Sequence, residues 1–143
     1  MGAVEQKIRK DIFRHVEAEL YAYPYRKREI ERIRLEIMSD SKEPFVAGGK
    51  NSVRQPGDPT GKVAIKLASS ARLMYLERVT DAIEQVYNSL PEPKQELICV
   101  KYWTHPQRLT TLGICEKIGI SERTYQRWRN QIVWEIAEIL GWS

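Results

Sequence analysis

The sequence predicts an all-α protein with a helix-turn-helix near its C-terminal end. Apolar residues recur at intervals of three and four along most of the 143-residue chain, as they do on amphipathic helices. Proline and glycine cluster at a few places that separate these periodic segments. Two short helical segments in the last third are joined by a turn at Gly119. We therefore expect an N-terminal helical hairpin and one long helix, followed by a C-terminal helix-turn-helix.

The composition is ordinary for a soluble globular protein, with 42% hydrophobic and 29% charged residues. The N-terminus is charged, and no apolar run approaches the roughly 20 residues that a membrane span requires, so we expect a cytoplasmic protein without a signal peptide. Cys99 and Cys115 both lie in apolar helical contexts, which favours reduced, buried thiols over a disulfide.

The N-terminal segment, residues 1–39, is expected to form the helical hairpin. Its first helix covers residues 4–21, where apolar positions repeat at i+4. Pro24 cannot continue a helix and restricts the residue before it, so the sequence predicts a corner there. The second helix, residues 27–38, carries Ile30, Ile33 and Ile37 on one side.

Residues 40–62 form a Gly/Pro-rich segment, and a long, flexible loop is expected there. It resembles a phosphate loop superficially, but Lys62 is followed by Val63 rather than by Ser or Thr. Residues 63–90 are expected to be the longest helix, whose apolar stripe packs against the hairpin or forms an oligomer seam. Small residues on this helix, Ala64, Ala68 and Ala71, would let another helix approach closely.

The expected DNA-binding domain spans residues 91–143. A support helix over residues 92–102 follows Pro91, and a short helix begins at Thr110 or Thr111, both of which are N-capping residue types. Gly119 permits the left-handed backbone that turns the chain. Ser121 can then cap the second helix, which continues to Gly141.

The second helix has two chemically different faces. Tyr125, Trp128 and Ile132 share a packing face, whereas a polar face carries Arg123, Gln126, Arg127 and Asn130. Arginine can bond guanine, and glutamine or asparagine can bond adenine, so residues 121–130 are expected to enter the major groove. The alternative is an ordinary helical hairpin with a solvated basic face.

Further residues are placed for the DNA backbone. Thr110, Thr111, Lys117 and Arg129 are expected at phosphates, and the DNA-binding set is completed by Ser121 and Thr124. Residues 101–130 contain six basic and two acidic side chains, a net charge of +4, so the remainder of the chain nets zero. A local positive charge of this kind favours a polyanion as partner.

Neither an enzyme nor a cofactor is expected. The chain has only two histidines, His15 and His105, and no clustered carboxylates that would suggest a catalytic site. Cys99, His105 and Cys115 lack the spacing of metal ligands, so no metal site is expected.

Leu90 to Leu140 resembles the fourth region of the bacterial housekeeping sigma-factor family. The matching elements are the Leu-Pro entry, a helix ending in Lys101-Tyr102, the Leu109-Thr110 start, and the turn Ile118-Gly119-Ile120-Ser121.

Over nearly the whole chain, the order of elements is similar to RinA-type late-transcription activators of phages of Gram-positive bacteria. The matching pieces are Glu19-Leu20 through Tyr23-Pro24, Ile30-Glu31 with Glu36-Ile37-Met38, the Gly/Pro-rich loop, Ala82-Ile83-Glu84, and Ile120-Ser121-Glu122-Arg123-Thr124. The resemblance implies a DNA-binding activator of phage late genes, acting in the cytoplasm of the bacterial host.

The expected partners follow from this resemblance and from the helix-turn-helix. They are double-stranded DNA, with bacterial RNA polymerase and a second copy of the chain as further candidates. A small terminase-like DNA-recognition protein of phage packaging is the alternative function, because such a protein also combines a helix-turn-helix with an oligomerising helical part.

Overall fold

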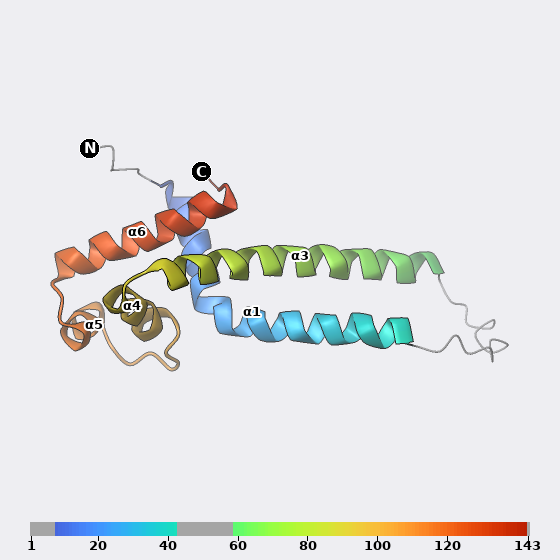
Figure 1. The fold of residues 1–143 in the computed structure, drawn as a ribbon, viewed down its shortest axis with the longest axis horizontal. Coiled ribbons are helices and arrows are strands. Elements are labelled where there is room, and N and C mark those ends of the chain that lie inside the picture. The colour runs from blue at the N-terminus through green and yellow to red at the C-terminus, as the bar shows by residue number, and fades with distance from the viewer. Residues whose placement is uncertain (1–7, 43–58, 143) are drawn as a thin grey trace. The chain divides into compact units, whose positions relative to one another are not determined.

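The computed structural model describes residues 8–42 and 59–142, and these residues are almost entirely helical. The helices are α1 (Lys10–Lys42), α3 (Pro59–Ser89), α4 (Glu92–Tyr102), α5 (Thr111–Ile118) and α6 (Glu122–Leu140), as Figure 1 shows. The all-α expectation is confirmed for these residues. Within the described ranges, no helix is both long and apolar enough to cross a membrane.

The chain divides into two compact units. Unit 1 combines residues 1–24 with residues 79–143, and unit 2 is the intervening segment Tyr25–Arg78. Helices α1 and α3 therefore each contribute to both units. The division differs from the predicted domains at 1–39, 40–62, 63–90 and 91–143, because the first half of α1 groups with the C-terminal helices.

Unit 1 has the larger hydrophobic core. Val16 and Leu20 of α1 are fully buried. So are Leu97 and Ile98 on α4 and Ile132 on α6. The other buried apolar side chains of this unit are Val79, Ala82, Ile83, Val86, Leu90, Val100, Tyr102, Ile114, Cys115, Tyr125, Val133, Ile136, Ala137 and Leu140. The core of this unit thus receives side chains from α1, α3, α4, α5 and α6.

The corner predicted at Pro24 is wrong, because α1 continues through it to Lys42. Proline lacks the N–H that would bond the carbonyl of Leu20, four residues earlier. In this structure the Leu20 carbonyl accepts a hydrogen bond from Nε1 of Trp103, at 3.0 Å. An indole from the segment after α4 thus satisfies the acceptor that Pro24 leaves open, and a proline inside the helix is tolerated.

Unit 2 pairs the second half of α1 with the first half of α3. Ile30, Ile33 and Leu76 are buried, and Ile37, Leu73 and Tyr75 pack against them. Figure 1 shows the two segments running side by side in opposite directions. The hairpin predicted within residues 1–39 is therefore wrong, since Ile30 and Ile33 meet α3 instead of an earlier helix.

Ion pairs reinforce the packing of unit 2. Arg72 donates two hydrogen bonds to Glu29, and Arg34 bonds Glu77. Because Arg72 bonds it, the pKa of Glu29 lies below its ordinary value. The predicted loop at 40–62 is shorter at both ends than expected, since α1 reaches Lys42 and α3 begins at Pro59. The rest of that loop lies outside the described residues.

Candidate nucleic-acid interface

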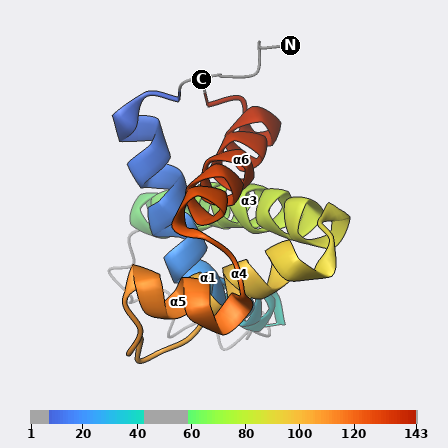
Figure 2. The ribbon, with the colours of Figure 1, turned by 90° about the vertical axis from the view of Figure 1, so that its left-hand side faces the viewer.

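The last three helices, α4, α5 and α6, all belong to unit 1 (Figure 2). Helix α4 has the bounds predicted from the sequence, with Pro91 at its N-cap position. Its buried side chains are Leu97, Ile98, Val100 and Tyr102. Helix α4 thus supports the pair α5 and α6, as predicted.

The caps and the turn between α5 and α6 are as predicted. The hydroxyl of Thr110 accepts a hydrogen bond from the Gly113 amide at 3.0 Å, which caps α5. Gly119 adopts a left-handed conformation, with φ of 82° and ψ of 39°, and its N–H bonds the carbonyl of Cys115. The hydroxyl of Ser121 then accepts from the Thr124 amide at 3.1 Å and begins α6. The turn is therefore encoded locally.

One side of each helix is buried in unit 1. Ile114 and Cys115 of α5 are buried, and burial raises the pKa of the Cys115 thiol. Tyr125 and Ile132 of α6 are buried, whereas Trp128 is half-buried beneath the Lys94 ammonium, 5.6 Å from the ring centre. The predicted packing face of α6 is thus confirmed.

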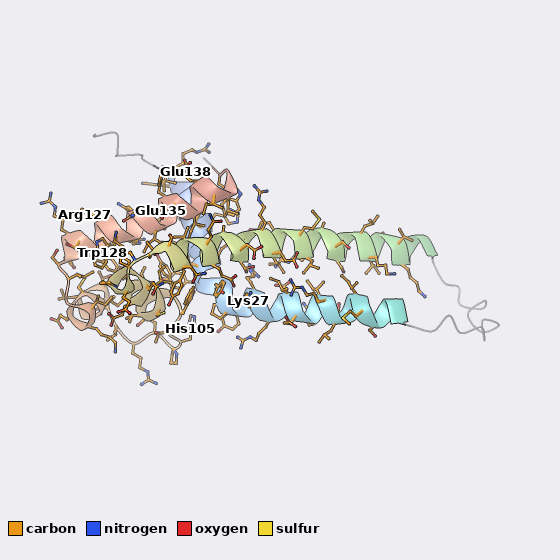
Figure 3. The ribbon with its side chains drawn as sticks, viewed as in Figure 1. Lys27, His105, Arg127, Trp128, Glu135 and Glu138 are labelled. Atoms are coloured by element: carbon orange, nitrogen blue, oxygen red, sulfur yellow. The ribbon has the colours of Figure 1, made fainter. Side chains whose placement is uncertain are left out.

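The opposite side of α6 presents the polar side chains predicted to read DNA. Arg123, Gln126, Arg127 and Asn130 are all exposed. They fall at i, i+3, i+4 and i+7, so the helix brings them to one face. Figure 3 shows the Arg127 side chain extending outward from the N-terminal half of α6. This "α6 polar face", Arg123, Gln126, Arg127 and Asn130, offers donors and acceptors in a row.

Arg129 has a different environment from these four residues. Its Nε lies 2.7 Å from Oε2 of Glu17 and its Nη2 lies 2.9 Å from Oε1, a two-point ion pair with α1. Its guanidinium also lies over the ring of Phe13 at 4.8 Å, and Nη1 donates to Gln126. The expected phosphate ligand is thus engaged within unit 1.

Glu17 is the centre of this cluster. It also accepts a hydrogen bond from the Tyr102 hydroxyl at 2.6 Å. Burial raises the pKa of Glu17, but the hydrogen bonds from Arg129 and Tyr102 outweigh burial and bring that pKa below its ordinary value. Burial and the charge of Glu17 raise the pKa of Tyr102, and the hydrogen bond to Glu17 raises the pKa of Arg129. The carboxylate of Glu17 therefore stays ionised and links α1, α4 and α6.

Lys101 also makes its contacts within unit 1. Its ammonium bonds the Tyr21 hydroxyl at 3.1 Å and lies 5.0 to 5.6 Å from the ring centres of Tyr21, Tyr102 and Tyr125. Burial lowers the pKa of Lys101, but hydrogen bonds to Tyr125 and Tyr21 raise it by more, so the amine stays charged. Of the six basic residues counted over residues 101–130, those that are exposed are Arg108, Lys117, Arg123 and Arg127.

The other predicted site residues lie around the start of α5 and the turn. Thr111 and Lys117 are exposed, and Thr124 is half-buried. The hydroxyls of Thr110 and Ser121 are used as helix caps. None of these placements tests the DNA-binding roles, which stay predictions.

Sequence reasoning missed the contribution of α1 to this unit. Glu17 holds α6, the Tyr23 hydroxyl donates to Glu84 of α3, and His15 stacks on Trp142 at 4.2 Å between ring centres. Each contact joins residues more than 60 positions apart, so local periodicity could not reveal it. The density of aromatic residues at 21–25 and at 102–103 was the available indication.

Comparison with known proteins adds two matches. The family described as "Protein of unknown function (DUF722)" matches residues 21–138 of this chain. The "Transcriptional activator rinA" of Staphylococcus phage phi11 is 29% identical over 128 residues, which cover 90% of this chain and 89% of that protein. No solved structure matches. The resemblance to RinA-type proteins predicted from the sequence is confirmed, whereas the likeness to sigma-factor region 4 stays a prediction.

Proposed function

The chain belongs to the family described as "Protein of unknown function (DUF722)", and we propose that it is a sequence-specific DNA-binding activator of phage late-gene transcription. Two things support the proposal. A relative that covers nearly the whole chain is named a transcriptional activator. The α6 polar face is also exposed directly after a capped turn, as in proteins that place a second helix in the major groove.

The observation that carries the proposal is the exposure of all four residues of the α6 polar face. A helix that enters the major groove needs exposed polar side chains near its N-terminus, and these four are exposed, although Gln126 also accepts a hydrogen bond from Arg129. Arg123 and Arg127 would bond guanine, and Gln126 and Asn130 would bond adenine. The opposite side of α6 is anchored in the core, so the whole recognition segment 121–130 is presented rigidly.

Phosphate contacts would position α6 without specifying sequence. Thr111 lies in the first turn of α5, where the backbone N–H groups and the helix dipole favour an anion. Lys117 is exposed near the other end of the same helix. Arg129 can reach a phosphate only by giving up Glu17, so we propose that its main contribution is to hold α6 in place.

The proposed partners are double-stranded DNA and the RNA polymerase of the bacterial host, in whose cytoplasm the activator would act. A second copy of the chain would be a further partner if the DNA site is a two-fold repeat. Light scattering of the purified protein distinguishes a monomer or dimer from the large closed ring expected of a packaging protein.

The direct test is a footprint on DNA from the late region of the phage genome that encodes the chain. We expect protection of a defined site upstream of a late promoter. Replacing Arg127 with Ala should weaken binding by about 1 to 3 kcal/mol and relax the preference at one base pair. Arg14→Ala is the matched control, because it removes an exposed arginine from α1 of the same unit. No protected site, or equal binding by Arg127→Ala and the unmodified chain, would refute the assignment.

The salt dependence of binding provides a second, quantitative check. The exposed cations of residues 101–130 that are not assigned to bases are Arg108 and Lys117, and if both contact phosphate the slope of log K against log salt is about −1.8 per chain. Lys117→Ala should reduce the slope by about 1 and affect all sequences alike. A much steeper slope would mean that cations outside this region contact the DNA.

A further inference from the structure

The described residues of unit 2 expose several large apolar side chains. Large exposed apolar side chains are found at eleven described positions, and seven of these lie in unit 2. They are Tyr25, Leu35, Met38, Val63, Ile65, Leu67 and Met74. Among the residues of this unit whose burial the structure describes, those that are buried are Ile30, Ile33 and Leu76. Contiguous exposed apolar side chains of this kind mark sites of protein interaction.

Three of these residues form a stripe along α3. Val63, Leu67 and Met74 fall at i, i+4 and i+11, which is one face of a helix. Their exposed fractions are 56%, 66% and 69%. Leu76, which is buried in the cluster with Ile30 and Ile33 of α1, lies on the opposite side of α3. This "α3 outer stripe", Val63, Leu67 and Met74, is thus turned away from the packing partner that α3 already has.

The neighbourhood of the stripe suits the close approach of another helix. Ala64, Ala68 and Ala71 are exposed beside it. Small side chains shorten the distance at which two helix axes can pack. A partner helix with an apolar face could pack on exposed apolar residues at this spacing, and the neighbouring alanines would let it come close.

The charge of unit 2 determines what kind of helix can dock. Its described residues carry ten basic and five acidic side chains, a net charge of +5. On residues 59–78 of α3 the one acidic residue is Glu77, which already bonds Arg34. Lys62 and Lys66 are exposed and are next to Val63 and Leu67 in the sequence. Two copies docking here would bring two sets of positive charge together, which costs free energy. DNA would match the charge but not the apolar side chains.

We propose that the α3 outer stripe is the docking surface for an acidic, amphipathic helix of the transcription apparatus. The partner helix would lay its apolar face on Val63, Leu67 and Met74 and place carboxylates near Lys62 and Lys66. This inference rests on the proposed function for the choice of partner. It assigns DNA reading to unit 1 and the protein contact to unit 2.

The test uses the full chain and purified bacterial RNA polymerase as the probe. The variant Leu67→Glu with Met74→Glu places two carboxylates on the stripe, and we expect polymerase binding to fall about tenfold or more. Leu35→Glu is the matched control, because Leu35 is 63% exposed and lies on α1 of the same unit. Both variants change only exposed positions, so circular dichroism and the footprint should match the unmodified chain.

Two further measurements sharpen the test. A photo-reactive amino acid at position 67 should cross-link to a polymerase subunit, and one at position 35 should not. Lys62→Glu with Lys66→Glu should slow association with polymerase and reduce its salt dependence, because these lysines attract the acidic partner.

Other results overturn the proposal. Equal polymerase binding by Leu67→Glu/Met74→Glu and Leu35→Glu, or no binding by the unmodified chain, removes the docking surface. A lower mass of the double variant in light scattering assigns the stripe to a second copy, and a loss of DNA affinity alone assigns it to DNA. Polymerase binding that depends on Leu67 without any DNA footprint would refute the proposed function and leave this inference standing.

Discussion

Replacing Glu17 with Gln tests whether one carboxylate of α1 holds the proposed recognition helix. The variant keeps the size of the side chain and removes its charge. In the unmodified chain Glu17 accepts two hydrogen bonds from Arg129 and one from Tyr102, at 2.6 to 2.9 Å. An amide offers one oxygen acceptor and turns its NH2 group toward the remaining donors, so at least one of these bonds is lost.

The size of the effect follows from the burial of the pair. Hydrogen bonds to a charged group are worth about 1.5 to 3 kcal/mol each, and breaking a fully buried pair costs about 3 to 5 kcal/mol. The side chains of Glu17 and Arg129 are 14% and 26% exposed, so solvent screens part of the loss. We expect a loss of about 2 kcal/mol in the free energy of unfolding. For 143 residues unfolding together, this corresponds to a decrease in Tm of about 7 °C.

The assay is urea unfolding and thermal denaturation of Glu17→Gln beside Asp11→Asn. Asp11, in the first turn of α1, pairs with Arg9, and their side chains are 65% and 71% exposed, so this control should lose less than about 0.5 kcal/mol. A double-mutant cycle with Arg129→Gln should give a coupling energy of about 2 kcal/mol. If Glu17→Gln is no less stable than Asp11→Asn, or if the coupling is near zero, Glu17 does not hold α6.

Three other predictions concern stability. Gly119→Ala should cost about 1 kcal/mol in urea unfolding, because at φ 82° a Cβ strains the backbone although no atom within 4 Å would clash with it. Folding lowers the pKa of Glu17, so the ionised carboxylate contributes to the free energy of unfolding above its unfolded pKa of about 4.3, and this contribution is lost as pH falls through the folded pKa. Below about pH 4, the difference in stability between Glu17→Gln and the unmodified chain should therefore shrink. Trp103→Phe should lower the free energy of unfolding by about 1 to 3 kcal/mol, because it leaves the Leu20 carbonyl without its donor. The loss should be smaller in a Pro24→Ala background, where the backbone N–H of residue 24 can bond that carbonyl. Equal losses in both backgrounds would contradict this account.

The C-terminal helices could be predicted from the sequence because their boundaries are set by neighbouring residues. Pro91, Thr110, Gly119 and Ser121 each act within one turn of their own position, through a fixed φ, a capping hydroxyl or a left-handed backbone. The spacing that separates the buried from the exposed side of α6 is also local. For these elements the sequence contained all the necessary information.

The path of α1 could not be predicted in the same way. Pro24 is a helix breaker by every local rule, and the group that compensates for it, the Trp103 indole, lies 83 positions from Leu20. The partner of Arg129 is 112 positions away. An arginine at a solvent-facing position of a recognition helix and an arginine bonded to a distant carboxylate have the same local sequence. Only the fold distinguishes them.

The net positive charge is assigned to a different part of the chain when it is counted by unit than when it is counted along the sequence. Counted along the sequence, the net charge of +4 coincides with residues 101–130. Counted by unit, residues 1–24 and 79–143 together carry eleven basic and twelve acidic side chains, and the positive excess lies in Tyr25–Arg78. Because Lys101 and Arg129 are also engaged internally, the proposed DNA-binding unit has few cations to spare for unspecific attraction. Its affinity would then depend on the α6 polar face together with the few exposed cations beside it. The positive excess of unit 2 is consistent with the acidic protein partner proposed above.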